Sequence, residues 1–323
     1  MAMAGAVGRG FGALLVLAVV SGASAAEAPK VIVTIKPVHA LVSQIMSGIA
    51  TPALIVDGAA SPHTFTLKPS TARAINEADV FIRVSDALEP FTRKITQSLP
   101  AGVTVLTLAD APGITLLDQR KGGTFESHHH DAGGENDGGA GHEDHNEDAQ
   151  GKDGHIWLDP QNAKVIVRAA LRALIGRYPE YAAKMTVNAT ALEGRLDALS
   201  AELATQLNDV RGKPFILFHD ATQYFENRFG LSASGSITVS PDVPPSAKRL
   251  TEVRRKISTL GAVCVFTEPN FQPNLVAAVT EGTQAHAGML DAEGQMLAAG
   301  PDLYFELMRG LARNLAGCLT APS

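Results

Sequence analysis

The chain has 323 residues, 45% of them hydrophobic, and a formal net charge of −6. This length fits one large or two modest domains with a substantial core. The acidity is local, because residues 121–154 contain nine Asp or Glu and two Lys while the remainder is close to neutral. No Lys/Arg cluster of the kind that follows phosphates occurs in the sequence, so nucleic acid is not an expected partner.

The first 26 residues have the pattern of a signal peptide. Arg9 supplies a positive start, and residues 11–20 (FGALLVLAVV) form an apolar run too short to span a bilayer. Small residues then offer cleavage sites after Ala25 or Ala26. No Cys lies near the cleavage point, so we expect a soluble exported protein without a lipid anchor.

After the signal peptide, short apolar runs alternate with helical patterns, which is typical of βαβ units with a parallel sheet. Strands are predicted at 31–35, 53–56, 80–84, 103–108, 215–219, 234–239, 262–268 and 287–291. Helices are predicted at 39–49, 70–78, 87–99, 160–177, 249–261, 273–285 and 302–316.

The fold predicted from this order is α/β, with two lobes that each contain a roughly four-stranded parallel sheet flanked by helices. The lobes are assigned to 27–178 and 210–323. One apolar stripe runs through 179–209 and predicts a long helix that joins them. Residues 121–154 are rich in Gly, His and acids and have almost nothing to bury, so this loop is predicted to be disordered.

The chain contains two cysteines, Cys264 and Cys318. In an oxidising compartment an even pair favours a disulfide, and the alternative is two separate buried thiols.

Three of the ten histidines stand in similar settings. His63 lies in a Gly/Pro/Ser loop after a predicted strand, His155 lies where the polar loop ends, and His219 ends the strand FILFH. Ligands of parallel α/β sheets bind beyond the carboxyl ends of the strands. Glu268 and Asp291 end two strands of the second lobe, so these five side chains could converge on one interlobe cleft.

Three imidazoles with one oxygen ligand suit tetrahedral Zn²⁺, whereas harder ions prefer more carboxylates. The alternative for each histidine is a buried or capping residue without a ligand. His39 and His286 have no comparable setting and are assigned that structural role. The remaining histidines all lie in the acidic loop: His128, His129, His130, His142 and His145.

Several segments carry a more specific resemblance: IVTIKPVHALVSQIM, SPHTFTLKPS, NEADVFIRVSDALEPF, GHIWLDPQNA, FHDATQYFENRFGL and FTEPNFQPNLVAAV. Through them the chain resembles the periplasmic zinc-binding component of the bacterial high-affinity zinc ABC importer, a family that includes manganese-binding relatives. Zinc-type members also insert a His-rich acidic loop before HIWLDP. Many have a disulfide in the second lobe, which the resemblance places at Cys264 and Cys318.

The resemblance implies that His63, His155 and His219 are the metal ligands. It leaves the fourth position open between Asp291 and water, because Pro62 stands where some zinc-type members have a Glu ligand. Glu268 is expected to orient a histidine or to hold a water, and its alternative role is that of a helix cap.

The resemblance also implies a function. The protein would capture Zn²⁺ as transported cargo and deliver it to an ABC-type membrane permease. It would act as a monomer and catalyse no reaction. No GxxxxGK[ST] motif occurs in the sequence, so the cytoplasmic ATPase is expected to be a separate chain.

The acidic loop has two interpretations. Its histidines could bind zinc weakly and raise the local zinc concentration near the cleft, or the loop could be a spacer that binds metal only incidentally.

Three rival functions remain. Manganese capture is disfavoured by three histidines and the His-rich loop. A zinc hydrolase is disfavoured because neither HExxH nor GxSxG occurs. An exported adhesin-like protein with the same fold is disfavoured by the missing lipid anchor.

Overall fold

The structure is a computed structural model, and it describes Met1 and residues 28–120, 125, 151–238, 245–269 and 273–321. Apart from Met1, the predicted signal peptide lies outside these residues, and so do the five loop histidines. Across the described ranges, no helix combines the length and the apolar character that a membrane span requires.

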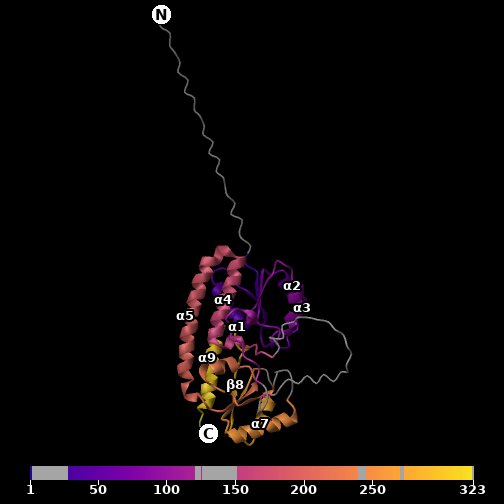
Figure 1. Cartoon of the computed structure of the whole chain (residues 1–323), viewed down its shortest axis with the longest axis vertical. Coiled ribbons are helices and arrows are strands. Elements are labelled where there is room, and N and C mark those ends of the chain that lie inside the picture. The colour runs from indigo at the N-terminus through magenta and orange to yellow at the C-terminus, as the bar shows by residue number, and fades with distance from the viewer. Residues whose placement is uncertain (2–27, 121–124, 126–150, 239–244, 270–272, 322–323) are drawn as a thin grey trace, which may run out of the picture.

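Two parallel four-stranded sheets form the centres of two lobes (Figure 1). Their strand orders are β2-β1-β3-β4 and β6-β5-β7-β8, so the two lobes share one topology and confirm the predicted fold class. The strands are β1 Val31–Ile35, β2 Ala53–Val56, β3 Val80–Arg83, β4 Thr104–Thr107, β5 Phe215–His219, β6 Gly235–Thr238, β7 Cys264–Thr267 and β8 His286–Met289.

Helices flank both sheets, and short 3₁₀ turns connect several elements. The α-helices are α1 Lys36–Ile45, α2 Pro69–Asn76, α3 Arg93–Ser98, α4 Pro160–Arg177, α5 Ala182–Gln206, α6 Gln223–Phe229, α7 Ala247–Leu260, α8 Pro273–Thr280 and α9 Leu303–Leu319. The 3₁₀ turns are η1 Pro90–Thr92, η2 Leu108–Asp110, η4 Ile156–Leu158, η5 Pro179–Tyr181 and η6 Asn208–Val210.

Several helix boundaries differ from the prediction for local reasons. Helix α1 begins at Lys36, before the predicted residue 39, because Pro37 fits the first turn of a helix. Helix α7 begins at Ala247 because the Ser246 hydroxyl accepts a hydrogen bond from a backbone N–H of the first turn. The predicted helix 87–99 is divided into η1 and α3, and the seven-residue helix α6 has no counterpart in the prediction.

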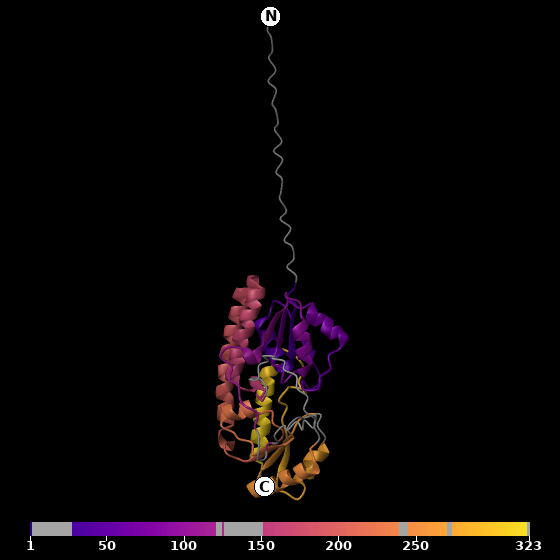
Figure 2. The same cartoon turned by 45° about the vertical axis from the view of Figure 1, so that its right-hand side comes forward.

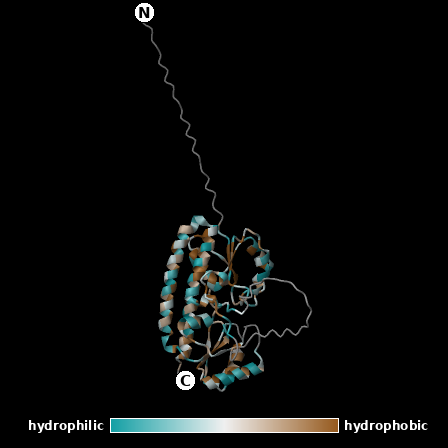
Figure 3. Ribbon diagram, viewed as in Figure 1, coloured by the Kyte–Doolittle hydropathy of each residue, from teal (hydrophilic) through white to brown (hydrophobic). Residues whose placement is uncertain are grey.

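Alternate strand residues face different cores, as the period of a strand requires. Val31, Val33 and Ile35 of β1 belong to a large cluster, whereas Ile32 belongs to a smaller one under α2 and α3. The large cluster contains buried residues of both lobes and of α5, so one hydrophobic core connects the lobes. Figures 1 and 2 show α5 running beside both lobes, and Figure 3 shows apolar strands at their centres.

Buried hydrogen bonds also join the lobes. The Trp157 indole N–H donates to the carbonyl of Ala292 at 2.9 Å, and the Tyr304 hydroxyl donates to the carbonyl of Trp157 at 2.8 Å. A partly buried bond is added by the Lys36 ammonium, which donates to the carbonyl of Leu297 at 3.0 Å. Because losing one partner of a buried pair leaves a costly unsatisfied group, these bonds resist separation of the lobes.

Cys264 of β7 and Cys318 of α9 form the expected disulfide, with their Cα atoms 6.2 Å apart. The bond ties the last helix to the sheet of the second lobe.

We expect a Cys264→Ser/Cys318→Ser double variant to lose stability. Closing a loop with a sequence separation of 54 contributes up to about 4 kcal/mol in the chain-entropy model. Urea unfolding under non-reducing conditions measures this loss. Metal affinity serves as the control and should not change, because Cys264 begins β7 whereas the metal ligands are expected beyond the opposite strand ends. An unchanged unfolding midpoint would contradict the expectation.

Candidate metal centre

His63, His155 and His219 come together from three separate segments. One ligand nitrogen from each ring lies within 4.8 Å of the other two. The ring centroids are 5.5 Å apart for His63 and His155, 5.4 Å for His63 and His219, and 5.2 Å for His155 and His219. This is the only such group of three or more His, Cys, Asp or Glu among the described residues.

The topology explains the convergence. His219 is the last residue of β5, an inner strand of its sheet, and His63 lies in the loop that follows β2. His155 precedes the turn η4, whose residues Ile156–Leu158 are fully buried. The carboxyl ends of parallel strands are where such folds bind ligands. His63 and His155 belong to the first sheet's half of the chain and His219 to the second.

The rings are buried in a way that fits a cation. His155 is 3% exposed and His219 is 6% exposed. The Nε2 atoms of His63 and His155 are buried and have no hydrogen-bond partner among the described residues. Since a buried polar atom without a partner is costly, these two nitrogens need a ligand to complete them.

Two of the histidines have a carboxylate at the other ring nitrogen. Nδ1 of His219 lies 3.1 Å from Oε1 of Glu268, the residue predicted to orient a histidine. Nδ1 of His155 lies 2.7 Å from Oδ1 of Asp153. This role of Asp153 was not predicted, although its position two residues before a candidate ligand could have suggested it. Such contacts fix the ring and raise its basicity toward a metal.

The surroundings shift the pKa values of two histidines in opposite directions. Burial, together with the neighbouring His219 and His155, holds the pKa of His63 well below its ordinary value of 6.5. For His219 burial alone would lower the pKa, but the charge and hydrogen bond of Glu268 raise it above 6.5. His63 is therefore neutral and ready to bind at neutral pH, whereas His219 retains a proton to higher pH.

Asp291, a candidate for the fourth ligand, is not part of the three-histidine group. Its Oδ1 accepts a hydrogen bond from the backbone N–H of Gln295 at 2.8 Å, and its Oδ2 accepts one from that of Met296 at 2.9 Å. In this conformation the carboxylate organises the loop between β8 and α9.

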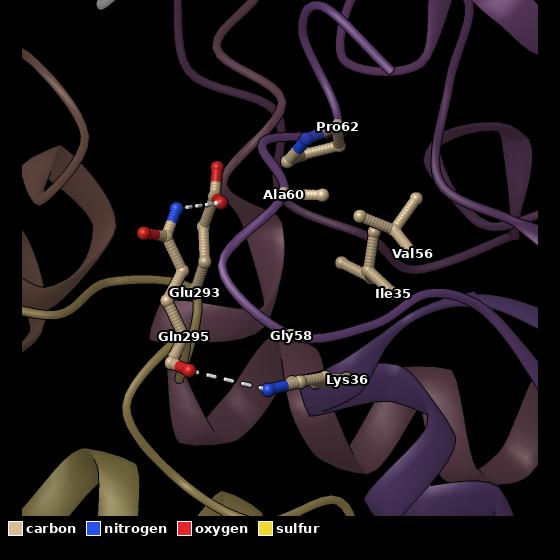
Figure 4. Close-up of a pocket in the computed structure, with 8 residues that line it drawn as sticks. All are labelled: Ile35, Lys36, Val56, Gly58, Ala60, Pro62, Glu293 and Gln295. Atoms are coloured by element: carbon tan, nitrogen blue, oxygen red, sulfur yellow. Dashed lines mark hydrogen bonds between the residues drawn. The ribbon is translucent and has the colours of Figure 1, made fainter. Parts of the chain in front are cut away.

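Glu293 in the same loop was missed by sequence analysis. Burial, with a further contribution from Glu268, raises the pKa of Glu293 to about 8 although its hydrogen bond with Gln295 opposes the shift. It lines a small pocket with Pro62 and Ala60, toward which its carboxyl group extends in Figure 4. The Gln295 amide donates to Oε2 of Glu293 at 2.8 Å.

The two histidines assigned to structural roles lie outside the group. The His39 side chain in α1 is buried, and its Nε2 lies 2.9 Å from the carbonyl oxygen of Pro52. His286 is the first residue of β8. The loop histidines lie outside the described residues. Residues 151–154, which the sequence placed in the loop, pack against the segment that precedes it. The N–H of Asp153 donates to the carbonyl of Leu117, and the N–H of Gln119 donates to the carbonyl of Gly151.

Two α/β lobes with a buried three-histidine group define a class, that of two-lobed solute-binding proteins for a metal ion. Residues 31–318 match the model of the family described as "Zinc-uptake complex component A periplasmic", and the chain belongs to this family. The family consists of transport proteins that bind a solute, not of enzymes, in agreement with the sequence prediction.

Relatives support this membership over nearly the whole chain. The high-affinity zinc uptake system protein ZnuA of Brucella suis biovar 1 (strain 1330) is 46% identical over 311 residues, which are 92% of this chain and 93% of that protein. The ZnuA protein of Yersinia pestis is 33% identical over 297 residues, covering 90% of this chain and 91% of its own length.

Solved structures share the fold at lower identity. The periplasmic zinc-binding protein TroA of Treponema pallidum has a TM-score of 0.75 at 19% identity, with 91% of this chain and 100% of that one covered. The laminin-binding protein Lmb of Streptococcus agalactiae, described as having adhesin and metal transporting activity, has a TM-score of 0.73 at 23% identity, with the same coverage. At such identities the similarity establishes the fold alone.

We expect metal affinity to decrease as the pH is lowered, and we expect Glu268 to determine the pH at which this decrease begins. Zn²⁺ binds neutral imidazoles, so the proton on His219 must leave when the metal binds. Because the pKa of His219 is raised, the decline should begin above pH about 6.5. Glu268→Gln removes the charge that raises this pKa, so its affinity should be lower and decline from a lower pH. Competition titrations across pH measure both effects, and an identical pH profile in this variant would contradict the prediction.

Proposed function

We propose that the protein captures one Zn²⁺ ion between its lobes through His63, His155 and His219 and delivers it to an ABC-type membrane permease. The observation that carries the proposal is the convergence of three imidazoles, one nitrogen of each lying within 4.8 Å of the others. Nε2 of His63 and Nε2 of His155 are also buried without a partner among the described residues. The names of the relatives, which are zinc uptake proteins, support zinc as the cargo.

The donor set favours zinc over manganese. Three neutral nitrogen ligands suit tetrahedral Zn²⁺, whereas Mn²⁺ prefers carboxylate and carbonyl oxygens. The fourth ligand is Asp291 or a water. For Asp291 to bind, its carboxylate must move toward the three imidazoles, because it is not part of their group in this conformation. A water ligand requires no such rearrangement.

Capture should involve local movement more than wide opening of the lobes. The shared core, helix α5 and the buried bonds of Trp157 and Tyr304 all oppose a large separation. The loop that carries Asp291 is itself held by the bonds of Ala292 and Leu297 to the first lobe. We therefore expect the loop that carries His63 to be the segment that rearranges when zinc enters.

The cellular context follows the family, whose described location is periplasmic. We propose that residues 1–26 are cleaved as a signal peptide, that the mature protein is a monomer without a lipid anchor, and that its lobes are 27–178 and 210–323, joined by 179–209. The permease would be driven by an ATPase on a separate chain. His128, His129, His130, His142 and His145 would bind zinc weakly and raise its concentration near the site.

Competition titrations with Zn²⁺ and Mn²⁺ test the proposal on the full mature chain, on a version without residues 126–150, and on His63→Ala. We expect one tight zinc site that survives the deletion and weakens by at least about 100-fold in His63→Ala, since ligand removal costs more than the 10–100-fold typical of outer contacts. The deletion stops at 150 because the N–H of Asp153 donates to the carbonyl of Leu117.

His39→Ala is the matched control, because this buried histidine lies outside the group. Loss of tight binding on deletion of 126–150 would mean that the primary site is in the loop. Mn²⁺ binding tighter than Zn²⁺ binding would overturn the choice of metal.

A further inference from the structure

Asp153 is a buried carboxylate that contacts one metal histidine twice. It is 4% exposed, and its Oδ1 accepts a hydrogen bond from the backbone N–H of His155 at 3.0 Å. The same oxygen lies 2.7 Å from Nδ1 of the His155 ring. Both contacts hold the ring in one orientation relative to its own backbone.

This contact determines which ring nitrogen can bind a metal. A carboxylate is an acceptor only, so it favours the tautomer of His155 that carries its proton on Nδ1. The lone pair of Nε2 then points away from Asp153. In this structure Nε2 of His155 is buried and has no hydrogen-bond partner among the described residues. The His155 ring belongs to the three-histidine group.

A tyrosine of the second lobe holds Asp153 in place. The Tyr224 hydroxyl in α6 donates to the carbonyl of Asp153 at 2.8 Å and accepts from the backbone N–H of Leu117 at 3.0 Å. The N–H of Asp153 donates to the carbonyl of Leu117 at 2.9 Å. One buried hydroxyl therefore joins two backbone segments, and it comes from the element that follows His219.

A second set of contacts joins the segment before His155 to the second lobe. The Arg120 guanidinium binds Asp220, the residue after His219, and also Glu226 of α6 with distances of 2.7 Å and 2.9 Å to its two carboxylate oxygens. Gln119, next to Arg120, donates its N–H to the carbonyl of Gly151 at 2.8 Å. The segment that leads to His155 is thus anchored on the lobe that carries His219.

We propose that Asp153 is a positioning residue for metal capture, which fixes the His155 ring with Nε2 toward the metal, and that Tyr224 holds Asp153 from the opposite lobe. The proposal rests on the function proposed above. Together with Glu268 and His219, it gives each lobe one carboxylate–histidine pair at the same centre. Outer carboxylates of this kind are worth about 10–100-fold in metal affinity.

The test combines histidine NMR of the metal-free protein with zinc competition titrations. The wild type should show the His155 tautomer protonated on Nδ1. Asp153→Ala should lose this signature and bind zinc about 10–100-fold more weakly. Asp153→Asn keeps an acceptor oxygen without the charge, so it should keep the tautomer and weaken binding less. Tyr224→Phe should change both readouts in the direction of Asp153→Ala.

Asp197→Ala is the matched control, because this exposed carboxylate pairs with Lys164 on the helices and should leave both readouts unchanged. If Asp153→Ala does not fold, Asp153→Asn and Tyr224→Phe test the proposal in its place. Wild-type zinc affinity in both of these variants would overturn the proposal. The His155→Ala variant distinguishes failure of the positioning role from failure of the proposed function. If it loses tight binding while Asp153→Ala retains the tautomer and the affinity, only the positioning role fails. If His155→Ala itself binds zinc tightly, the proposed function fails.

Discussion

The three imidazoles must be held at a fixed separation although they belong to two lobes. A metal centre tolerates errors of only a few tenths of an ångström in ligand position, so the relative placement of the lobes is part of the site. The chain meets this requirement with one hydrophobic cluster that continues from the first sheet through α5 to α9. Burial of apolar surface is the dominant favourable term in folding, and here it also sets the geometry of the ligands.

Electrostatic interactions also prepare the three imidazoles to bind a metal ion. Imidazoles this close together cannot all be positively charged. Burial, and then the neighbouring His219 and His155, lower the pKa of His63. The carboxylates of Asp153 and Glu268 each engage one Nδ1 and leave the opposite nitrogen for a metal. The site is thus arranged for a cation before one arrives, which reduces the reorganisation that binding requires.

Much of this was predictable from sequence because the signals are local. Strands β1, β2 and β5 follow from short apolar runs. The grouping of His63, His155 and His219 follows from histidines placed at strand ends or loop ends in recognisable motifs. The disulfide followed from the pairing of the only two cysteines.

What escaped prediction depends on contacts between distant segments. The hydrogen bond from Trp157 to Ala292 joins residues 135 positions apart in the sequence, so no local sequence pattern predicts it. The burial of Glu293 depends on the approach of its loop to Pro62 in the other lobe. Asp153 is the exception, since its spacing from His155 is local and was available in the sequence.

Anomalous diffraction at the zinc edge, from crystals of the zinc-loaded mature protein, would locate the metal ion. We predict one strong peak bounded by Nε2 of His63, Nε2 of His155 and Nε2 of His219, at about 2.0–2.1 Å from each. A principal zinc peak elsewhere, or one that lacks any of the three imidazoles, would contradict it.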